Sequence, residues 1–88
     1  MNTFKLTVST PDGNSFDGSA AALFVRGSEG DLAVLASHAP FVTSVKECEC
    51  RILTEDGDEI KAEIKGGILS VSEGGETTLL TTSFKMEK

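Results

Sequence analysis

Apolar and polar side chains alternate with a period of two along most of this chain, and that alternation restricts its fold more than any other feature. Near the N-terminus, Phe4, Leu6 and Val8 fall on one side of an extended segment, with lysine and hydroxyl side chains on the other. The segments 48–52 and 60–64 repeat the pattern. Because successive side chains of a strand point to opposite faces, the sequence predicts half-buried β-strands throughout.

Turn signals separate the alternating segments. Thr10-Pro11-Asp12-Gly13 has a proline that pre-sets a turn and a closing glycine, and residues 55–58 have Asp-Gly at their centre. Further turns are expected at residues 27–30 and at Gly74-Gly75. We expect the glycine pair 66–67 to mark a bulge or a close approach between backbones.

Two strand boundaries follow from the same signals. Asp17-Gly18 is expected to end a short strand around residues 14–16, and residues 77–84 are expected to form one last strand. About ten short strands, mainly antiparallel, with a turn every eight to twelve residues, are typical of a β-sandwich or barrel. The fold class is therefore all-β, in a single domain spanning residues 1–88.

Charge and hydropathy exclude several classes of function. The chain has 14 acidic and 8 basic residues, a net charge of −6, which disfavours nucleic acid and anionic lipid as direct ligands. It favours a basic or polar protein partner. No leader peptide and no apolar run near the ~18 residues of a spanning helix are visible. We therefore expect no direct membrane insertion, and any membrane association to come through a partner.

Catalytic, metal and cofactor sites are not predicted. Cys48 and Cys50 alternate on one strand face and are interpreted as reduced core side chains, with no further ligands for a metal. Ser37 and His38 are neighbours whose side chains diverge on an extended chain, so they do not form a nucleophile–base pair. The Gly-Ser-Glu-Gly turn at 27–30 lacks the lysine and helix of a phosphate loop.

The segment 27–40 is the most distinctive part of the surface. It combines a glycine-rich acidic turn containing Glu29, the acidic Asp31, and a His38-Ala39-Pro40 corner. Glycines lose much backbone entropy on ordering, so this composition contributes little to folding alone. We interpret the segment as a recognition edge that the rest of the chain presents.

Ordered motifs along the chain carry a family resemblance. They are Val8-Ser9-Thr10-Pro11-Asp12-Gly13, then Phe16 and Gly18, Gly27-Ser28-Glu29-Gly30-Asp31-Leu32, His38-Ala39-Pro40, and Gly66-Gly67-Ile68-Leu69-Ser70-Val71. In this order and spacing, the chain resembles the N-terminal β-sandwich domain of the epsilon subunit of F-type ATP synthases. The family's proline-glycine before the histidine is Ala36-Ser37 here, and its Lys-Pro-Gly before the middle strand is Lys46-Glu47-Cys48.

The resemblance implies a flattened sandwich of ten strands and a non-catalytic place in the rotor. One surface would grip the gamma subunit, and another would rest on the polar loops of the membrane c-ring. By position, the expected c-ring contacts are Glu29, Asp31, His38, Ala39 and Pro40. The implied location is peripheral, on the cytoplasmic side of a bacterial inner membrane, with no cofactor.

Two other interpretations remain open at the level of sequence. A free-standing β-sandwich adaptor would use the same edge for an unrelated protein interaction. A small hydrolase would require a catalytic pair, which the sequence does not offer.

The family usually continues into a C-terminal helical hairpin, and the present sequence ends at Lys88 without residues for it. Inhibition or ATP sensing by those helices is therefore not assigned to this chain.

Overall fold

Every regular element in the computed structural model is a β-strand, and the structure describes residues 2–36 and 39–87. The nine strands within those residues are β1 Phe4–Thr10, β2 Gly13–Gly27, β3 Gly30–Leu35, β4 Phe41–Val45, β5 Cys48–Thr54, β6 Glu59–Ile64, β7 Gly67–Val71, β8 Thr77–Thr81 and β9 Phe84–Met86. The all-β prediction is confirmed. No helix able to span a bilayer occurs in the described ranges.

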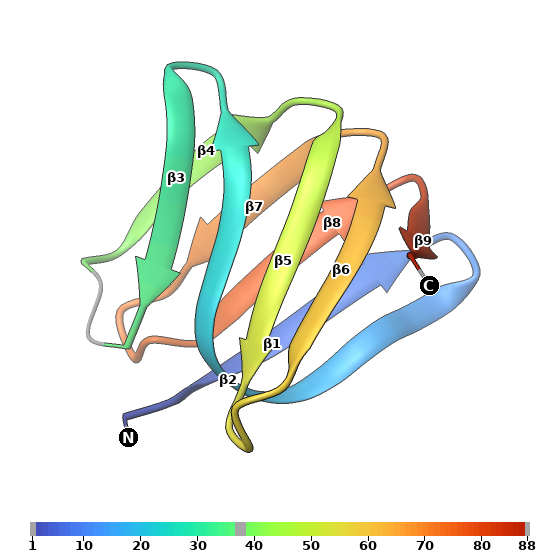
Figure 1. The fold of residues 1–88 in the computed structure, drawn as a ribbon. Coiled ribbons are helices and arrows are strands. Elements are labelled where there is room, and N and C mark those ends of the chain that lie inside the picture. Colours follow the sequence, from blue (N-terminus) through green and yellow to red (C-terminus); the bar gives the residue numbers. More distant parts are fainter. Residues whose placement is uncertain (1, 37–38, 88) are drawn as a thin grey trace.

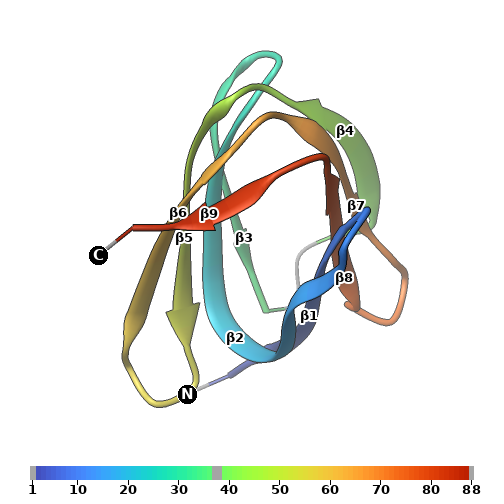
Figure 2. The same cartoon turned by 90° about the vertical axis from the view of Figure 1, so that its right-hand side faces the viewer.

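The strands form two facing layers, seen from the front in Figure 1 and after a quarter turn in Figure 2. One layer holds β3, β2, β5 and β6 side by side, and the other holds β4, β7, β8 and β1. The long strand β2 joins the layers, because its first half pairs with β1 and its second half pairs with β3 and β5. Pairing is antiparallel except between β1 and β8, which agrees with the mainly antiparallel prediction.

The space between the layers holds the predicted inward-facing side chains. Phe4, Leu6 and Val8 are buried, and the alternating residues of β5 and β6 are buried in the same way. The largest fully buried aliphatic side chains are Leu6, Leu23, Ile52, Ile64, Leu69 and Leu79. Period-two patterning therefore identifies the core residues of β1, β5 and β6, whereas residues 20–23 of β2 are all buried and do not alternate.

The predicted strand break at Asp17-Gly18 is wrong, because β2 runs unbroken through both residues. Thr7 lies opposite Asp17, and Leu6 lies opposite Gly18. A Cβ atom on Gly18 would lie 3.7 Å from the ring of Phe16, so the ring covers the surface that the missing side chain leaves. Pairing with β1 keeps the segment extended despite two residues of low strand propensity.

The single last strand predicted over residues 77–84 is instead two strands in different layers. β8 pairs with β7 and β1, whereas β9 pairs with β6. The chain crosses between the layers at Thr82-Ser83, where the Ser83 N–H donates a hydrogen bond of 3.5 Å to the Thr81 hydroxyl oxygen. A continuous strand would leave the edge of β6 uncovered.

The glycine pair 66–67 is a close backbone approach, as predicted. Gly67 lies between Val45 of β4 and Thr81 of β8, and a Cβ there would overlap the carbonyl oxygen of Leu80. The hydroxyl of Thr81 donates to the Gly66 carbonyl at 2.6 Å. The two glycines therefore let β4, β7 and β8 come together in one layer.

Candidate interaction surfaces

The β2–β3 hairpin positions the acidic residues of the predicted recognition edge. Gly27 pairs with Gly30, which leaves Ser28 and Glu29 as a two-residue loop. Gly30 has a φ of +125°, a backbone conformation that side chains disfavour. The turn therefore requires this glycine, and it holds Glu29 at the exposed tip with Asp31 one step along β3.

Arg26 is a member of this edge that the sequence reasoning missed. It lies directly opposite Asp31, and its Nε donates to the Asp31 carboxylate at 3.1 Å. Both side chains are largely exposed, so the ion pair contributes less than about 1 kcal/mol to stability. A two-residue loop at 28–29 already places residues 26 and 31 opposite each other, so the hairpin signal could have revealed the pair.

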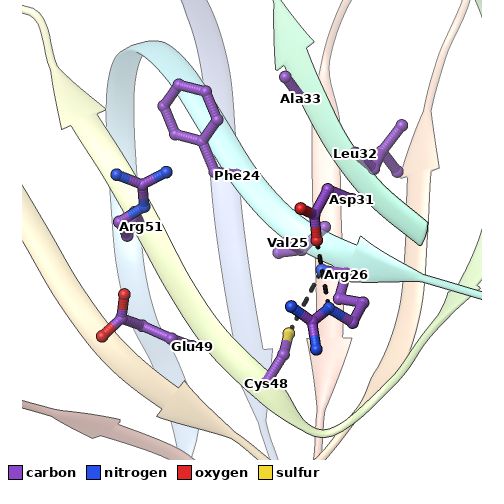
Figure 3. Close-up of a pocket in the computed structure, with 9 residues that line it drawn as sticks. All are labelled: Phe24, Val25, Arg26, Asp31, Leu32, Ala33, Cys48, Glu49 and Arg51. Carbon is purple, nitrogen blue, oxygen red and sulfur yellow. Dashed lines mark hydrogen bonds and ion pairs between the residues drawn. The ribbon is translucent and has the colours of Figure 1, made fainter.

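Asp31 and Arg26 also line a hollow of about 410 Å³ on the outside of β3, β2 and β5, shown in Figure 3. The Arg51 guanidinium lies 4.8 Å from the centre of the Phe24 ring and 3.5 Å from the Glu59 carboxylate. Each guanidinium in the hollow thus has a carboxylate partner. The hollow is suited to hydrogen bonding with a polar partner rather than to capturing a free anion.

Cys50 lies in the core as predicted, whereas Cys48 is half-buried and also lines the outer hollow, where the structure adds a role for it. The Cys48 sulfur accepts a hydrogen bond of 3.4 Å from the Arg26 backbone N–H, at the point where β2 and β5 separate. Cys50 is fully buried, and burial, with the neighbouring Cys48, raises its pKa to about 12. Within residues 2–36 and 39–87, no group of histidine, cysteine and carboxylate side chains is arranged to hold a metal.

The other predicted edge residues that the structure describes lie after β3, in its connection to β4. Ala39 and Pro40 are exposed in the connection to β4 and line a separate hollow with the β7–β8 turn at 73–76. Glu29 and Asp31 instead share a small hollow with Phe41 and Thr43 of β4. His38 lies outside the described residues. The structure thus brings Glu29 and Asp31 together at one end of β3 and places Ala39 and Pro40 together beyond its other end.

A second surface, which we call the neutral face, covers the outside of β1, β8, β7 and β4. Its outward side chains are Thr7, Ser9, Val42, Ser44, Ile68, Ser70, Thr78 and Leu80. Ile68 lies between Ser44 and Leu80 across the sheet, and Val42 is opposite Ser70. Val42, Ile68 and Leu80 are 70%, 50% and 49% exposed. These exposed aliphatic side chains, with hydroxyl side chains around them, make the neutral face a candidate protein-binding surface.

Charged residues are concentrated on the opposite layer instead. The outer sides of β5, β6 and β9 hold Glu49, Arg51, Glu59, Lys61, Glu63 and Lys85. At the margin of the neutral face, Lys5 of β1 and Asp17 in the first half of β2 are charged, whereas Arg26 lies in the second half of β2, which belongs to the other layer. The sequence shows this asymmetry as the lack of any Asp, Glu, Lys or Arg in 41–45, 67–71 and 77–81.

Comparison with known proteins identifies the family. A family model described as ATP synthase, Delta/Epsilon chain, beta-sandwich domain matches residues 3–86. The chain belongs to this family. The resemblance seen in the sequence motifs is therefore confirmed, and so is the β-sandwich.

A relative and two solved structures add detail to the family match. The ATP synthase epsilon chain of Ruminococcus albus is 38% identical over 85 residues, covering 97% of this chain and 63% of that protein. A chain of the Euglena gracilis mitochondrial ATP synthase, in a cryo-EM structure of OSCP/F1/c-ring, has a TM-score of 0.89 and 25% identity over 96% of this chain and 53% of that one.

The second structure supports the fold alone. It is a chain of the Tetrahymena thermophila mitochondrial ATP synthase central stalk and c-ring, with a TM-score of 0.79, 11% identity, and coverage of 94% of this chain and 66% of that one. This chain spans 63% of the length of the Ruminococcus albus protein. What it shares with these proteins is the β-sandwich.

Proposed function

We propose that this chain is a non-catalytic central-stalk subunit of an F-type, proton-translocating ATP synthase. In this role it bridges the gamma subunit and the c-ring, and it couples proton flow to ATP synthesis by holding two moving parts together. The observation that carries the proposal is the family match over residues 3–86. A closely packed sandwich deforms little, which suits an element that transmits torque. In a bacterial cell the complex would place the chain on the cytoplasmic side of the inner membrane.

The neutral face is the surface that we assign to the gamma subunit. A permanent subunit interface buries about 800 Å² or more per partner and has an apolar centre with few charges. Ile68 and Leu80 are adjacent across β7 and β8 and supply such a centre, while the serines and threonines around them can form hydrogen bonds to a partner.

Binding to purified gamma subunit tests this assignment. The chain should co-elute with gamma at micromolar concentration, and Leu80→Lys should weaken the complex by about tenfold or more, because a lysine would be desolvated in an apolar contact. Met86→Lys is the matched control, since Met86 is 62% exposed on β9, away from the neutral face. Failure of the wild-type chain to bind gamma, or equal losses in both variants, would contradict the assignment.

The flank along β3 is the surface that we assign to the c-ring. Glu29 and Asp31 offer carboxylates at one end, and Ala39 and Pro40 follow the other end, with His38 beside them in sequence. Carboxylates accept strong hydrogen bonds from the arginine, lysine or amide side chains of exposed loops.

A charge reversal tests the c-ring assignment. Asp31→Lys should weaken assembly with the c-ring and leave the fold intact, because Asp31 is exposed and makes only a surface ion pair. Asp56→Lys, a reversal of equal size in the β5–β6 turn, should assemble normally. Membranes with the Asp31 variant that keep full proton-coupled synthesis would show that this residue is not a contact.

A further inference from the structure

β3 is an open edge of its layer. Its only strand partner among the described residues is β2, and in Figure 1 no strand of the same layer lies beyond it, although β4 of the other layer crosses behind it. The register between β2 and β3 is regular over six pairs, from Gly27 with Gly30 to Ala22 with Leu35. Every second residue of β3 therefore turns its backbone N–H and C=O away from β2.

Hydrogen bonds on the other side of β2 identify those residues. The Arg26 carbonyl accepts from the Lys46 N–H at 2.9 Å, and the Arg26 N–H donates to the Cys48 sulfur at 3.4 Å. Arg26 thus directs both backbone groups away from β3, so Asp31, which lies opposite it, directs its own groups to the open side. By alternation, the backbone groups of Ala33 and Leu35 also face that side.

The sequence of this edge does little to block pairing. Exposed edges are commonly protected by proline, lysine, a bulge or a very short strand. β3 has none of these, and its residues after Asp31 are Leu32, Ala33, Val34 and Leu35. Leu35 is 53% exposed, and the side chain of Asp31 is already paired with Arg26.

We propose that an extended segment of a neighbouring subunit adds to this edge as a further strand, forming hydrogen bonds with the backbones of Asp31, Ala33 and Leu35. The proposal rests on the assignment of the β3 flank to an assembly partner, and it specifies the chemistry of that contact. In the partner segment, every second residue near Leu35 should be apolar. The segment should also carry a lysine or arginine near Asp31 and Glu29, where this chain has two carboxylates.

A second copy of this chain fits the edge less well. Antiparallel self-pairing centred on Ala33 would place Asp31 opposite Leu35 of the other copy, so a carboxylate would lie beside an apolar side chain. It would also bring together two chains that each have a net charge of −6. The charges therefore favour a different, partly basic chain.

Residue-resolved amide hydrogen exchange tests the proposal with the free chain and with the chain assembled on gamma and the c-ring. In the free chain, the amides of Leu32 and Val34 should exchange slowly because they pair with β2, whereas those of Ala33 and Leu35 should exchange fast. In the assembly, exchange of the Ala33 and Leu35 amides should slow by about tenfold or more, because new hydrogen bonds form.

Each alternative outcome has a distinct meaning. An assembly that forms while Ala33 and Leu35 stay fast would overturn strand addition and leave the proposed function standing. No assembly would overturn both. Slowing of these amides in the free chain as its concentration rises would show that a second copy is the partner, against the proposal.

A matched pair of variants provides a second readout. Ala33→Pro removes the outward N–H and breaks no hydrogen bond to β2, because proline is tolerated where an edge N–H faces solvent. It should weaken assembly by about tenfold, whereas Ala33→Thr, which keeps the N–H, should assemble like the wild-type chain. Equal assembly of the two variants would overturn the proposal.

Discussion

At the scale of single residues, Gly67 is the position where the fold leaves least room. Any side chain there would overlap the Leu80 carbonyl, so Gly67→Ala must push β7 and β8 apart. We expect a loss of about 2–3 kcal/mol in the free energy of unfolding, measured by urea denaturation. Gly74→Ala should change stability by less than about 0.5 kcal/mol, since nothing lies within 4 Å of the added atom. Equal effects of the two variants would show that β7 and β8 are not so closely apposed.

Cys50 makes the free energy of unfolding of this chain depend on pH in the alkaline range. Its pKa is about 12 in the fold, against 9.0 for an unburied thiol, so the unfolded chain loses its proton first as the pH rises. The contribution of Cys50 to the free energy of unfolding is therefore fully present below pH 9.0. It falls between pH 9.0 and about 12, by roughly 1.4 kcal/mol per pH unit.

Comparison of variants isolates the contribution of Cys50. Cys50→Ala should have a lower free energy of unfolding at pH 7, because it leaves a small cavity, and a shallower decline above pH 9.0 than the wild type. Cys48→Ala should keep most of the wild-type decline, because burial is the larger cause of the raised Cys50 pKa and Cys48 the smaller one. The same slope in all three proteins would contradict burial of the Cys50 thiol.

At the scale of elements, β9 depends on one side chain. Phe84 is half-buried against the core, while the other two residues of the strand are exposed. Phe84→Ala should cost about 2–3 kcal/mol, less than a fully buried phenylalanine, and should speed exchange of the Glu87 amide, which donates to Lys61 at 2.8 Å. Met86→Ala should do neither. Retention of slow Glu87 exchange in the Phe84 variant would show that other contacts hold β9.

Local signals in the sequence predicted the elements better than their partners. Asp56-Gly57 and the two-residue loop after Gly27 both turn as expected, because short-range backbone geometry determines them. The strand break predicted at Asp17-Gly18 is absent, because the pairing of β1 with β2 outweighs the low strand propensity of these two residues. The parallel pairing of β1 with β8 joins segments about seventy residues apart, and no local pattern encodes it.

The candidate site was only partly predictable for a related reason. The composition of residues 27–40 indicated a recognition edge, but not that Ala39 and Pro40 line a different hollow from Asp31. That separation follows from β3, whose six residues span about 20 Å in an extended chain. The neutral face was also missed, because the sequence shows three separate uncharged segments and only the sheet order places β4, β7 and β8 side by side.

At the scale of the whole molecule, charge divides the sandwich into two kinds of surface. The neutral face lies outside β1, β8, β7 and β4, whereas the ion pairs and the open edge of β3 belong to the other layer. Two partners with different chemistry can therefore bind one rigid domain at the same time. This separation of surfaces agrees with the proposed role of binding the gamma subunit and the c-ring at the same time.

The most direct test of this account is the stoichiometry of a mixture of this chain, gamma subunit and detergent-solubilised c-ring, measured by analytical ultracentrifugation. We expect a ternary complex in which one copy of the chain is bound to both partners at once. If gamma displaces the c-ring from the chain, or the reverse, the two partners share one surface and the account is wrong.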